Sequence, residues 1–528
     1  MSCRRAAMLI AASGIAAPAV HAQSPPAKVR TVELDLARAR LPFDRSFDLS
    51  VGADFPGTLG RPDSLAQLKT AVDELGFRYV RFHAIFHDVL GTVKKRDGRI
   101  VYDWTGIDRL YDALLARGIK PFVELGFTPD AIRTSPQTLF YWKGNTSHPE
   151  IKAWAALVDA FVVHLRDRYG PAEVRNWYFE VWNEPNLDGF WEKADKSAYF
   201  ELYETSARTI KAIDPQLRVG GPATAGAAWV PDLLDFAAAR NIPIDFVTTH
   251  TYGVDGGFLD ERGEDDNRLS TKTDAIVADV RRVRAEIQAS KFPNLPLFFT
   301  EWSASYNPRD PVHDSYVSAA YILTKLRGTR GFAQGMSYWT YSDLFEEPGP
   351  PPTPFHGGFG LMNREGIRKP AWFAYKYLRA LGGREIPSAD DRVLATTEDG
   401  RTNVLLWNWT QPAQTLSNRP FFTKVLPAQA APATQIALSN LRPGSYRVTL
   451  RRTGFHANDA HTRYLEMGSP KTLTSAQLAE LQRLTSDRPE KSQMVTVARD
   501  GRYRLSVAMR TNDVVLATIE PAATERRR

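Results

Sequence analysis

Residues 177–186 read Trp177-Tyr-Phe-Glu-Val-Trp-Asn-Glu-Pro-Asn186, a short apolar and aromatic run that ends in polar residues. A helical pattern precedes this run at 151–169, where apolar residues recur three or four positions apart, and another follows at 199–213. A buried strand between two helices is the unit from which parallel sheets are built. The stretch therefore indicates an α/β fold.

The same theme recurs from about residue 49 to residue 345. Each apolar run ends in polar or aromatic residues, and a helical pattern such as 64–76, with a glycine at its end, follows. Eight repeats predict a closed (β/α)₈ barrel, whose active site lies at the C-terminal ends of the strands. No Gly-x-Gly-x-x-Gly fingerprint is present, which weakens a dinucleotide-binding alternative. The predicted strands are 49–55, 79–85, 121–127, 177–183, 218–222, 246–252, 297–303 and 336–342.

The pattern changes after Leu381-Gly-Gly383, where short strand-like runs separated by turn residues begin. This change predicts a catalytic barrel at 40–383 and an accessory β-sandwich at 386–522, and the segment 29–37 is a candidate further strand of the sandwich. The strand-like runs are 403–409, 445–451, 493–497 and 503–508.

One helix is expected to interrupt the sandwich near 476–484. Thr474 and Gln477, three residues apart, form the capping pair that marks a helix start.

The N-terminus has the pattern of a secretory signal peptide. Arg4 and Arg5 precede an apolar stretch at 6–20, and Val20-His-Ala22 supplies the small residues of a cleavage site. We therefore expect a signal peptide at 1–22 and a secreted or periplasmic enzyme. Since the single cysteine is Cys3, the mature chain is expected to lack disulfides, a Cys-zinc site and a thiolate nucleophile.

The composition excludes several partners. The formal charge is +7, and removal of Arg4 and Arg5 with the signal leaves +5. These charges are dispersed, whereas a nucleic-acid-binding protein clusters them, so neither a nucleic acid nor a membrane is an expected partner. With 43% hydrophobic residues, the chain can bury the core of one large domain and one smaller domain.

Two glutamates stand at predicted strand ends. Glu184 follows the fourth strand, and Glu301 lies within Thr300-Glu-Trp302 at the end of the seventh. A carboxylate at the rim of an apolar core is expected either to pair with a positive charge or to take part in the chemistry of a site. A buried ion pair would explain either glutamate alone, but two at barrel-strand ends, each beside aromatic residues, indicate catalysis.

The chain resembles glycoside hydrolase family 39, the β-xylosidase and α-L-iduronidase family of retaining (β/α)₈ enzymes. Asn-Glu-Pro alone matches the wider clan, whereas the ordered set of motifs matches the family, and the resemblance covers nearly the whole mature chain. The motifs that carry it are Asn183-Glu-Pro-Asn186, Thr300-Glu-Trp-Ser303, Phe82-His-Ala-Ile-Phe-His-Asp88, His250-Thr-Tyr-Gly253, Tyr338-Trp-Thr-Tyr-Ser-Asp-Leu-Phe-Glu-Glu347 and Met467-Gly-Ser-Pro470.

The resemblance implies that Glu184 is the acid/base and Glu301 the nucleophile. A general acid needs a raised pKa, and the negative charge of Glu301 is expected to raise the pKa of Glu184. Asn183 is implied as a donor to the 2-hydroxyl of the sugar. Other candidate substrate-binding residues are His83, His250, Tyr252, Trp339, Glu346 and Glu347.

Some of these candidates have a plain alternative. His250 and Tyr252 are two apart and share one face of a strand, so they could brace Glu301, touch sugar, or form a packed core pair. One of His83 and His87 could be structural. Glu124 lies inside the third strand and is interpreted as a buried structural partner.

The favoured activity is an exo-acting β-xylosidase that acts on xylo-oligosaccharides. An iduronidase must bind a sugar carboxylate, and that branch typically reads Asn-Glu-Pro-Asp, whereas this chain has Asn186. The alternatives left open are an α-L-iduronidase, an arabinosidase, an endo-acting glycosidase and a non-catalytic carbohydrate-binding protein.

With no His-Glu-x-x-His motif or cysteine cluster, we expect neither a metal nor a cofactor. The sequence does not indicate the oligomeric state.

Overall fold

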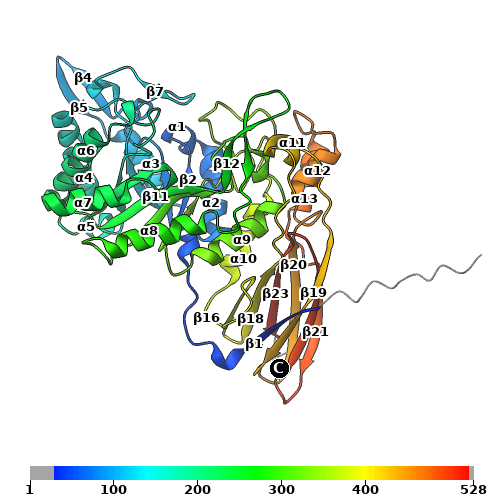
Figure 1. Cartoon of the computed structure of the whole chain (residues 1–528). Coiled ribbons are helices and arrows are strands. Elements are labelled where there is room, and N and C mark those ends of the chain that lie inside the picture. Colours follow the sequence, from blue (N-terminus) through cyan, green and yellow to red (C-terminus); the bar gives the residue numbers. More distant parts are fainter. Residues whose placement is uncertain (1–28, 523–528) are drawn as a thin grey trace, which may run out of the picture.

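A computed structural model describes residues 29–522, so the expected signal peptide at 1–22 lies outside the described residues. Helices and parallel strands alternate in one region, and antiparallel sheets form a second region beside it (Figure 1). Among the described residues, no helix combines the length and apolarity that a membrane span requires.

Eight parallel strands form a closed barrel, which confirms the predicted fold class. Each strand pairs with its neighbours in sequence, and the last closes on the first through Tyr338 and Val51. All eight predicted strands are present, although the eighth ends at Tyr338 and residues 339–342 leave the sheet. The barrel strands are β2 (Ser50–Ala53), β3 (Tyr79–Phe82), β6 (Lys120–Leu125), β9 (Tyr178–Val181), β10 (Arg218–Thr224), β11 (Phe246–Tyr252), β14 (Leu297–Ser303) and β15 (Gly335–Tyr338).

Amphipathic helices cover the outside of the barrel. The predicted 64–76 helix is α2, and Gly76 ends it in the left-handed conformation (φ 79°) that suits glycine. The helices of this region are α1 (Pro56–Leu59), α2 (Pro62–Leu75), α3 (Thr105–Leu115), α4 (Ile151–Tyr169), α5 (Pro171–Val174), α6 (Lys196–Ile213), α7 (Val230–Arg240), α8 (Val277–Ala289), α9 (Val317–Thr329) and α10 (Pro370–Ala380). Small hairpins in the loops are β4 (Val93–Arg96) with β5 (Arg99–Tyr102), β7 (Thr138–Leu139) with β8 (Gly144–Asn145), and β12 (Val254–Leu259) with β13 (Asp265–Leu269).

Aromatic rings close the N-terminal end of the barrel interior. Phe122 stacks on Tyr178 with ring centroids 4.7 Å apart, and Phe246 and Phe298 complete the cluster. Because this apolar plug fills one end, the polar side chains inside the barrel gather at the other, where the strands end.

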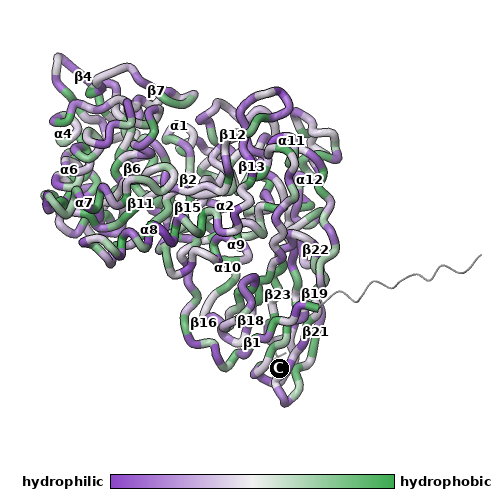
Figure 2. Tube along the Cα trace, in the orientation of Figure 1, coloured by the Kyte–Doolittle hydropathy of each residue, from purple (hydrophilic) through white to green (hydrophobic). Residues whose placement is uncertain are grey.

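The second region is a β-sandwich. Strand β1 (Arg30–Asp35) pairs in parallel with β19 (Ala430–Ser439), which in turn pairs with β22 (Tyr503–Arg510). Hydrophobic and hydrophilic residues alternate along these strands (Figure 2), and the apolar ones form a core between this sheet and a six-stranded sheet. The second sheet contains β16 (Arg384–Glu385), β17 (Val393–Glu398), β18 (Arg401–Trp407), β23 (Val514–Pro521), β20 (Gly444–Thr453) and β21 (Lys491–Val497), in that order.

The sandwich region holds more helix than the sequence indicated. The expected helix is α13 (Ser475–Leu484), and Thr474 and Gln477 form the capping box at its start. Two further helices, α11 (Asn418–Phe422) and α12 (Ala460–Glu466), lie in connections for which no helix was predicted. Both are short, with five and seven residues, so neither shows enough periods of an amphipathic pattern to predict.

Candidate active site

The turn after β9 presents Glu184. Glu184 itself has φ 45°, an uncommon conformation for a residue with a side chain, and its N–H donates to the carbonyl of Ala223 (2.8 Å). Asn186 exchanges two hydrogen bonds with the Ala225 backbone at 2.9 and 3.0 Å. These bonds tie the turn to the end of β10, so the carboxyl group of Glu184 is held over the barrel mouth.

Glu301 stands on β14 with both carboxylate oxygens engaged. The Arg81 guanidinium donates to Oε1 at 2.6 Å, and the Tyr252 hydroxyl donates to Oε2, also at 2.6 Å. Such charge-assisted hydrogen bonds are short and strong, and they fix the orientation of a carboxylate. Of the three roles left open for Tyr252, the structure shows the bracing of Glu301.

The two glutamates face one another in the same cavity. One carboxylate oxygen from each, together with a ring nitrogen of His250, lies within 4.8 Å of the others. Zn²⁺ accepts donors of these kinds, but Arg81 and Tyr252 already occupy both oxygens of Glu301. The arrangement therefore suits chemistry performed by the carboxyl groups themselves.

Burial sets the protonation of Glu184. It raises the pKa of Glu184 to about 7, while the positive charges of His83 and Arg81 oppose that rise. The expectation that the charge of Glu301 would be the cause is therefore wrong: removal of the carboxyl group from water is the main cause. His250 Nδ1 lies 2.9 Å from Glu184 Oε1, and burial lowers the pKa of His250 to about 4, so this ring is neutral at physiological pH.

One arginine organises the floor of the site. Arg81, fully buried on β3, donates to Glu180 (2.6 Å) as well as to Glu301 and lies 3.0 Å from Glu124. It also donates to Asn183 Oδ1 at 2.8 Å, which leaves the buried Nδ2 of Asn183 without a partner among the described residues. Asn183 lines the cavity, so this amide can donate to a bound hydroxyl.

Arg81 and Glu180 were not among the predicted site residues, although a signal for each is present in the sequence. Both charged residues stand in the middle of apolar strands, Tyr79-Val-Arg-Phe82 and Tyr178-Phe-Glu-Val181. A charge in such a position must find a partner inside the barrel. The expected structural role of Glu124 agrees with its full burial and its bond to His83 Nδ1 (2.8 Å).

The adjacent acids after β15 have different surroundings. Glu347 lines the cavity, and its Oε1 lies 3.2 Å from His83 Nε2. Burial raises the pKa of Glu347 to about 8. Glu346 instead accepts a hydrogen bond from Arg61 at 2.9 Å, and its side chain does not line the cavity. Of this predicted pair, only Glu347 is therefore placed to contact a ligand.

Trp339 supplies an apolar wall. A Cβ atom on Gly52 would lie 2.1 Å from the Trp339 ring, so glycine at that position makes room for the indole. His83 also lines the cavity, whereas His87 Nε2 donates to the carbonyl of Trp142 (3.0 Å) and is structural. The cavity measures about 440 Å³, and its lining comprises His83, Asn183, Glu184, Leu187, Phe190, Ala225, Gly226, Thr251, Tyr252, Val254, Asp279, Glu301, Tyr306, Trp339, Glu347 and Phe359.

A (β/α)₈ barrel with two facing carboxyl groups at the ends of its fourth and seventh strands has the construction of a retaining glycoside hydrolase. The model of Glycosyl hydrolases family 39 matches residues 30–504, and the chain belongs to that family.

Several proteins of known name or structure match this chain over nearly its whole length. A β-xylosidase of Geobacillus stearothermophilus is 36% identical over 499 residues, which cover 93% of this chain and 95% of the relative. The crystal structure of a family 39 enzyme from Xanthomonas axonopodis pv. citri is 64% identical with a TM-score of 0.93, and covers 94% of this chain and 98% of its own. A monomeric β-xylosidase from Caulobacter crescentus CB15 is 65% identical with a TM-score of 0.92, and covers 94% of this chain and all of its own.

Proposed function

We propose that this chain is a retaining, exo-acting β-xylosidase that releases xylose from xylo-oligosaccharides. The observation that carries the proposal is the close approach of Glu184 and Glu301. A carboxylate oxygen of one glutamate lies within 4.8 Å of a carboxylate oxygen of the other. Retaining enzymes hold the two carboxyl groups about 5–5.5 Å apart, whereas inverting enzymes need about 6.5–9.5 Å to admit a water.

In the proposed first step, Glu301 attacks the anomeric carbon while Glu184 protonates the departing glycosidic oxygen. Arg81 and Tyr252 hold the attacking carboxylate, and its negative charge disappears when the glycosyl ester forms. Glu184, now an anion, then removes a proton from water, which attacks the anomeric carbon and releases Glu301. The raised pKa of Glu184 suits a group that must serve as acid and then as base.

A neutral sugar fits the cavity lining. Among the described residues, no lysine or arginine lines the cavity, and Arg81 is already engaged with three carboxylates. The cationic His83 is held between Glu124 and Glu347, so an iduronide carboxylate would lack a free cationic partner. Asn183, His83 and Glu347 instead offer hydrogen-bonding groups to hydroxyls. The names of the relatives that match nearly the whole chain support xylose as the sugar.

The loop after β15 supports exo action. Trp339, Glu347 and Phe359 all follow or end this strand, and together they form one wall of the cavity. A site closed there would hold the terminal sugar of a chain and leave the remainder of the chain outside.

Variants test the division of roles. Glu301→Ala should lose nearly all activity on every substrate, because no nucleophile remains. Glu184→Ala should still react at the first step with aryl xylosides, whose leaving groups need little protonation, and added azide should restore turnover and give a β-glycosyl azide. Azide rescue of the Glu301 variant and not of the Glu184 variant would reverse the assignment.

A substrate panel tests the sugar. We expect the parent enzyme to show its highest kcat/KM on aryl β-xyloside, compared with aryl β-glucoside, α-arabinoside and iduronide. A higher kcat/KM on another member would replace xylose as the proposed sugar and leave the two-carboxylate mechanism standing. Activity on none of them would favour a carbohydrate-binding protein.

We also propose that the enzyme is exported, on the basis of the signal-peptide pattern at 1–22. N-terminal sequencing of the protein recovered outside the cytoplasm should give Gln23 as the first residue. Recovery of the protein from the cytoplasm alone, with Met1 retained, would contradict export.

A further inference from the structure

The mouth of the catalytic cavity has two halves of different character. Around the closed barrel, β10 and β11 stand between β9, which leads to Glu184, and β14, which carries Glu301. The opposite half, after β15 and β3, holds most of the residues proposed to surround the terminal sugar. The loops after β9, β10, β11 and β14 instead contribute mainly apolar residues to the cavity, which are Leu187, Phe190, Ala225, Gly226, Val254 and Tyr306.

The position of Glu184 indicates which part of a substrate this apolar half would meet. In the proposed mechanism Glu184 protonates the glycosidic oxygen, so the leaving part of the substrate begins beside this carboxyl group. Leu187 belongs to the same turn, where its N–H donates to the carbonyl of Glu184 at 3.0 Å, and its side chain is 40% exposed. Ala225 is tied to this turn by the two bonds with Asn186. The apolar half therefore borders the leaving group.

Tyr306 is the large exposed ring of this half. It lines the cavity and yet remains 52% exposed. Its ring meets that of Tyr252 at 81°, with centroids 6.2 Å apart, and a Cβ atom on Gly256 of β12 would lie 3.1 Å from its hydroxyl oxygen. Together with Val254, it forms the outer wall of this half. An aromatic ring in such a place offers apolar surface to the C–H face of a pyranose.

The further carboxylate on this half is already engaged. Asp279 Oδ2 accepts a hydrogen bond from the Thr251 hydroxyl at 2.7 Å, and Oδ1 accepts one from Arg282 at 3.2 Å. Each oxygen therefore has a donor within the protein. Recognition of a leaving sugar here would depend on apolar contact more than on bonds to its hydroxyls.

A buried asparagine of the sandwich region connects the two loops that carry the outer wall. Asn418, at the start of α11, is fully buried, and α11 lies beside the hairpin of β12 and β13 (Figure 1). Its Oδ1 accepts the N–H of Leu269 at 2.9 Å, and Leu269 stands opposite Val254 in the hairpin. Its Nδ2 donates to Asp310 Oδ2 at 2.7 Å, in the loop that carries Tyr306.

Neighbours of Asn418 attach the same segment to both strands of the hairpin. The Ser417 hydroxyl donates to the carbonyl of Leu259 on β12 at 3.0 Å. The N–H of Arg419 donates to Asp266 Oδ2 on β13 at 2.8 Å. The position of the outer wall therefore depends on a segment that lies outside the barrel.

We propose that the leaving part of the substrate lies between Leu187 and Tyr306, and that Asn418 of the sandwich region positions the outer wall. The inference deepens the proposed function and rests on it, because the side of the leaving group follows from the role of Glu184. Leu187 and Tyr306 hold the apolar face of the leaving ring. Asn418 is a positioning residue, which acts through the two loops and touches no substrate.

Three substrates that share a terminal xylose test the proposal. Xylobiose places a sugar between Leu187 and Tyr306, an aryl β-xyloside with an acidic phenol places an apolar ring there, and β-xylosyl fluoride places only fluoride there. The measured quantity is kcat/KM for each of the first two, divided by kcat/KM for the fluoride. A change at the terminal sugar or at the nucleophile affects all three substrates alike and cancels.

Tyr306→Ala should lower both ratios by about 10-fold, as expected when an apolar contact to a ring is lost. Tyr306→Phe keeps the ring and should keep both ratios. Asn418→Ala displaces the wall rather than removing it, so it should lower both ratios by roughly 3- to 10-fold. Ser417→Ala removes one bond of the same segment and is the milder second variant, with an expected decrease of about 2-fold.

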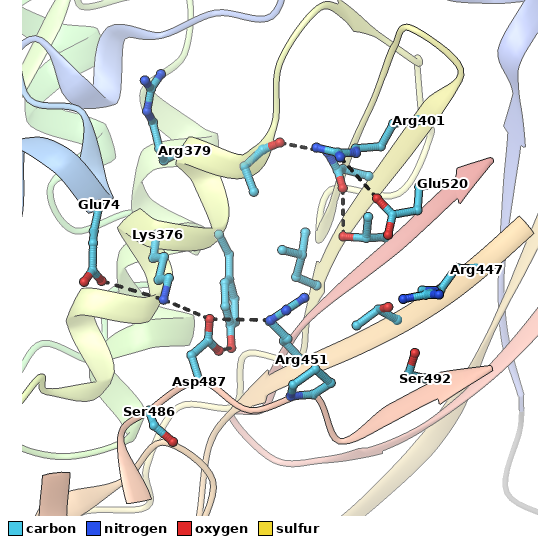
Figure 3. A pocket seen from close by; sticks show the side chains of 17 residues that line it. Glu74, Lys376, Arg379, Arg401, Arg447, Arg451, Ser486, Asp487, Ser492 and Glu520 are labelled. Carbon is cyan, nitrogen blue, oxygen red and sulfur yellow. Dashed lines mark hydrogen bonds and ion pairs between the residues drawn. The ribbon is translucent and has the colours of Figure 1, made fainter. Parts of the chain in front are cut away.

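The matched control is Asn458→Ala. Asn458 is also a buried asparagine of the sandwich region, and its Nδ2 lies 3.2 Å from Asp487 Oδ1 and 3.4 Å from the hydroxyl of Tyr377 on α10. Figure 3 shows this second joint between the regions, where Lys376 lies 3.1 Å from Asp487. None of the residues that line the cavity drawn there lines the catalytic cavity. The control should lower the melting temperature, as Asn418→Ala does, and keep both ratios of the parent.

Each part of the proposal has a result that overturns it. Ratios that Tyr306→Ala leaves unchanged would reject the ring as a wall for the leaving group. A decrease for xylobiose without one for the aryl xyloside would show that Tyr306 acts on protonation rather than by contact. Ratios that Asn418→Ala and Ser417→Ala lower no more than Asn458→Ala would reject the positioning role. Failure of the parent to hydrolyse any of the three substrates would reject the proposed function itself, which the other outcomes leave standing.

Discussion

At the residue scale, the chemistry depends on how differently two carboxyl groups are surrounded. Glu301 has a donor on each oxygen, from Arg81 and from Tyr252. Glu184 is buried beside a neutral His250, and no cation from residues 29–522 lies within ion-pair distance of it. The first environment suits an oriented anion, and the second suits a group that keeps its proton near neutral pH.

This difference predicts the pH dependence of the enzyme. Because burial raises the pKa of Glu184 to about 7, its acidic form persists up to that pH and is lost above it. Protonation of the leaving group needs this form, so kcat/KM for xylobiose should fall on the alkaline side with a midpoint near pH 7. A pH profile of kcat/KM measures it. In Glu184→Gln the alkaline limb of the residual activity should disappear, and its persistence would assign the limb to another group.

Glu346 and Glu347 form a matched pair for testing substrate contact. Glu347→Ala should lower kcat/KM for aryl β-xyloside by roughly 10- to 200-fold, because a buried hydrogen-bonding contact to sugar hydroxyls is lost. Glu346→Ala removes only a partly exposed pair with Arg61 and should change kcat/KM little. Steady-state kinetics on xyloside and glucoside measure both variants. Equal effects would show that the loop, rather than a contact by Glu347, determines activity.

At the element scale, the strands were predictable and their partners were not. Short apolar runs indicated all eight barrel strands, and the rule about strand ends led to Glu184 and Glu301. In the sandwich, β19 was missed because Ala430–Ser439 is rich in alanine and contains Pro432. The ladder with β22 shifts register between Ala431 and Thr434, which accommodates the proline.

The contacts inside the site were beyond prediction for a related reason. Arg81, on β3, joins side chains from three other strands, and the distances among strands are not visible in their spacing along the sequence. Glu346 and Glu347 are neighbours in a loop, where no periodicity tells which one points inward. The sequence therefore indicated the two central carboxylates, whereas the residues that brace them are evident only in the three-dimensional structure.

The loop after β15 depends on a buried clamp. Lys369 Nζ lies 2.6 Å from a carboxylate oxygen of Asp314 and 2.6 Å from one of Asp343, and all three side chains are almost fully buried. Asp343 also accepts the N–H of Gly360 at 2.7 Å, so the clamp holds both ends of the segment that carries Glu347.

Removal of the clamp should therefore affect stability and activity together. Lys369→Ala leaves two buried carboxylates unpaired, which should cost about 3–5 kcal/mol of unfolding free energy. Calorimetry should show a lower melting temperature, and kcat/KM should also fall because the loop loses its anchor. Lys376→Ala, which removes the partly exposed lysine of an ion pair on α10, the helix that follows Lys369, should cost at most about 1 kcal/mol. A clamp variant as stable as the control would show that Lys369 does not hold the loop.

At the scale of the whole molecule, the barrel and the sandwich share one core. Trp407 on β18 is fully buried, belongs to the same apolar cluster as the barrel helices, and donates through Nε1 to Thr324 of α9 at 3.0 Å. On the other side of the junction, Phe355 and Ile367 from the barrel pack with Tyr464 of α12. The sandwich thus supports the barrel at two separate places, one of them below the loop that carries Glu347.

A shared core predicts that the two regions unfold together. Trp407→Ala removes a fully buried ring and a hydrogen bond, which should cost about 3–5 kcal/mol. Because the cavity it leaves borders both regions, scanning calorimetry should show a single transition, shifted to lower temperature in the variant and with aryl-xyloside hydrolysis lost over the same temperature range. Met494→Ala, at a side chain 55% exposed on β21, should leave that transition in place. Two resolved transitions, of which the Trp407 variant lowers only one, would mean that the sandwich folds independently and that the apolar contact between the regions contributes little to either.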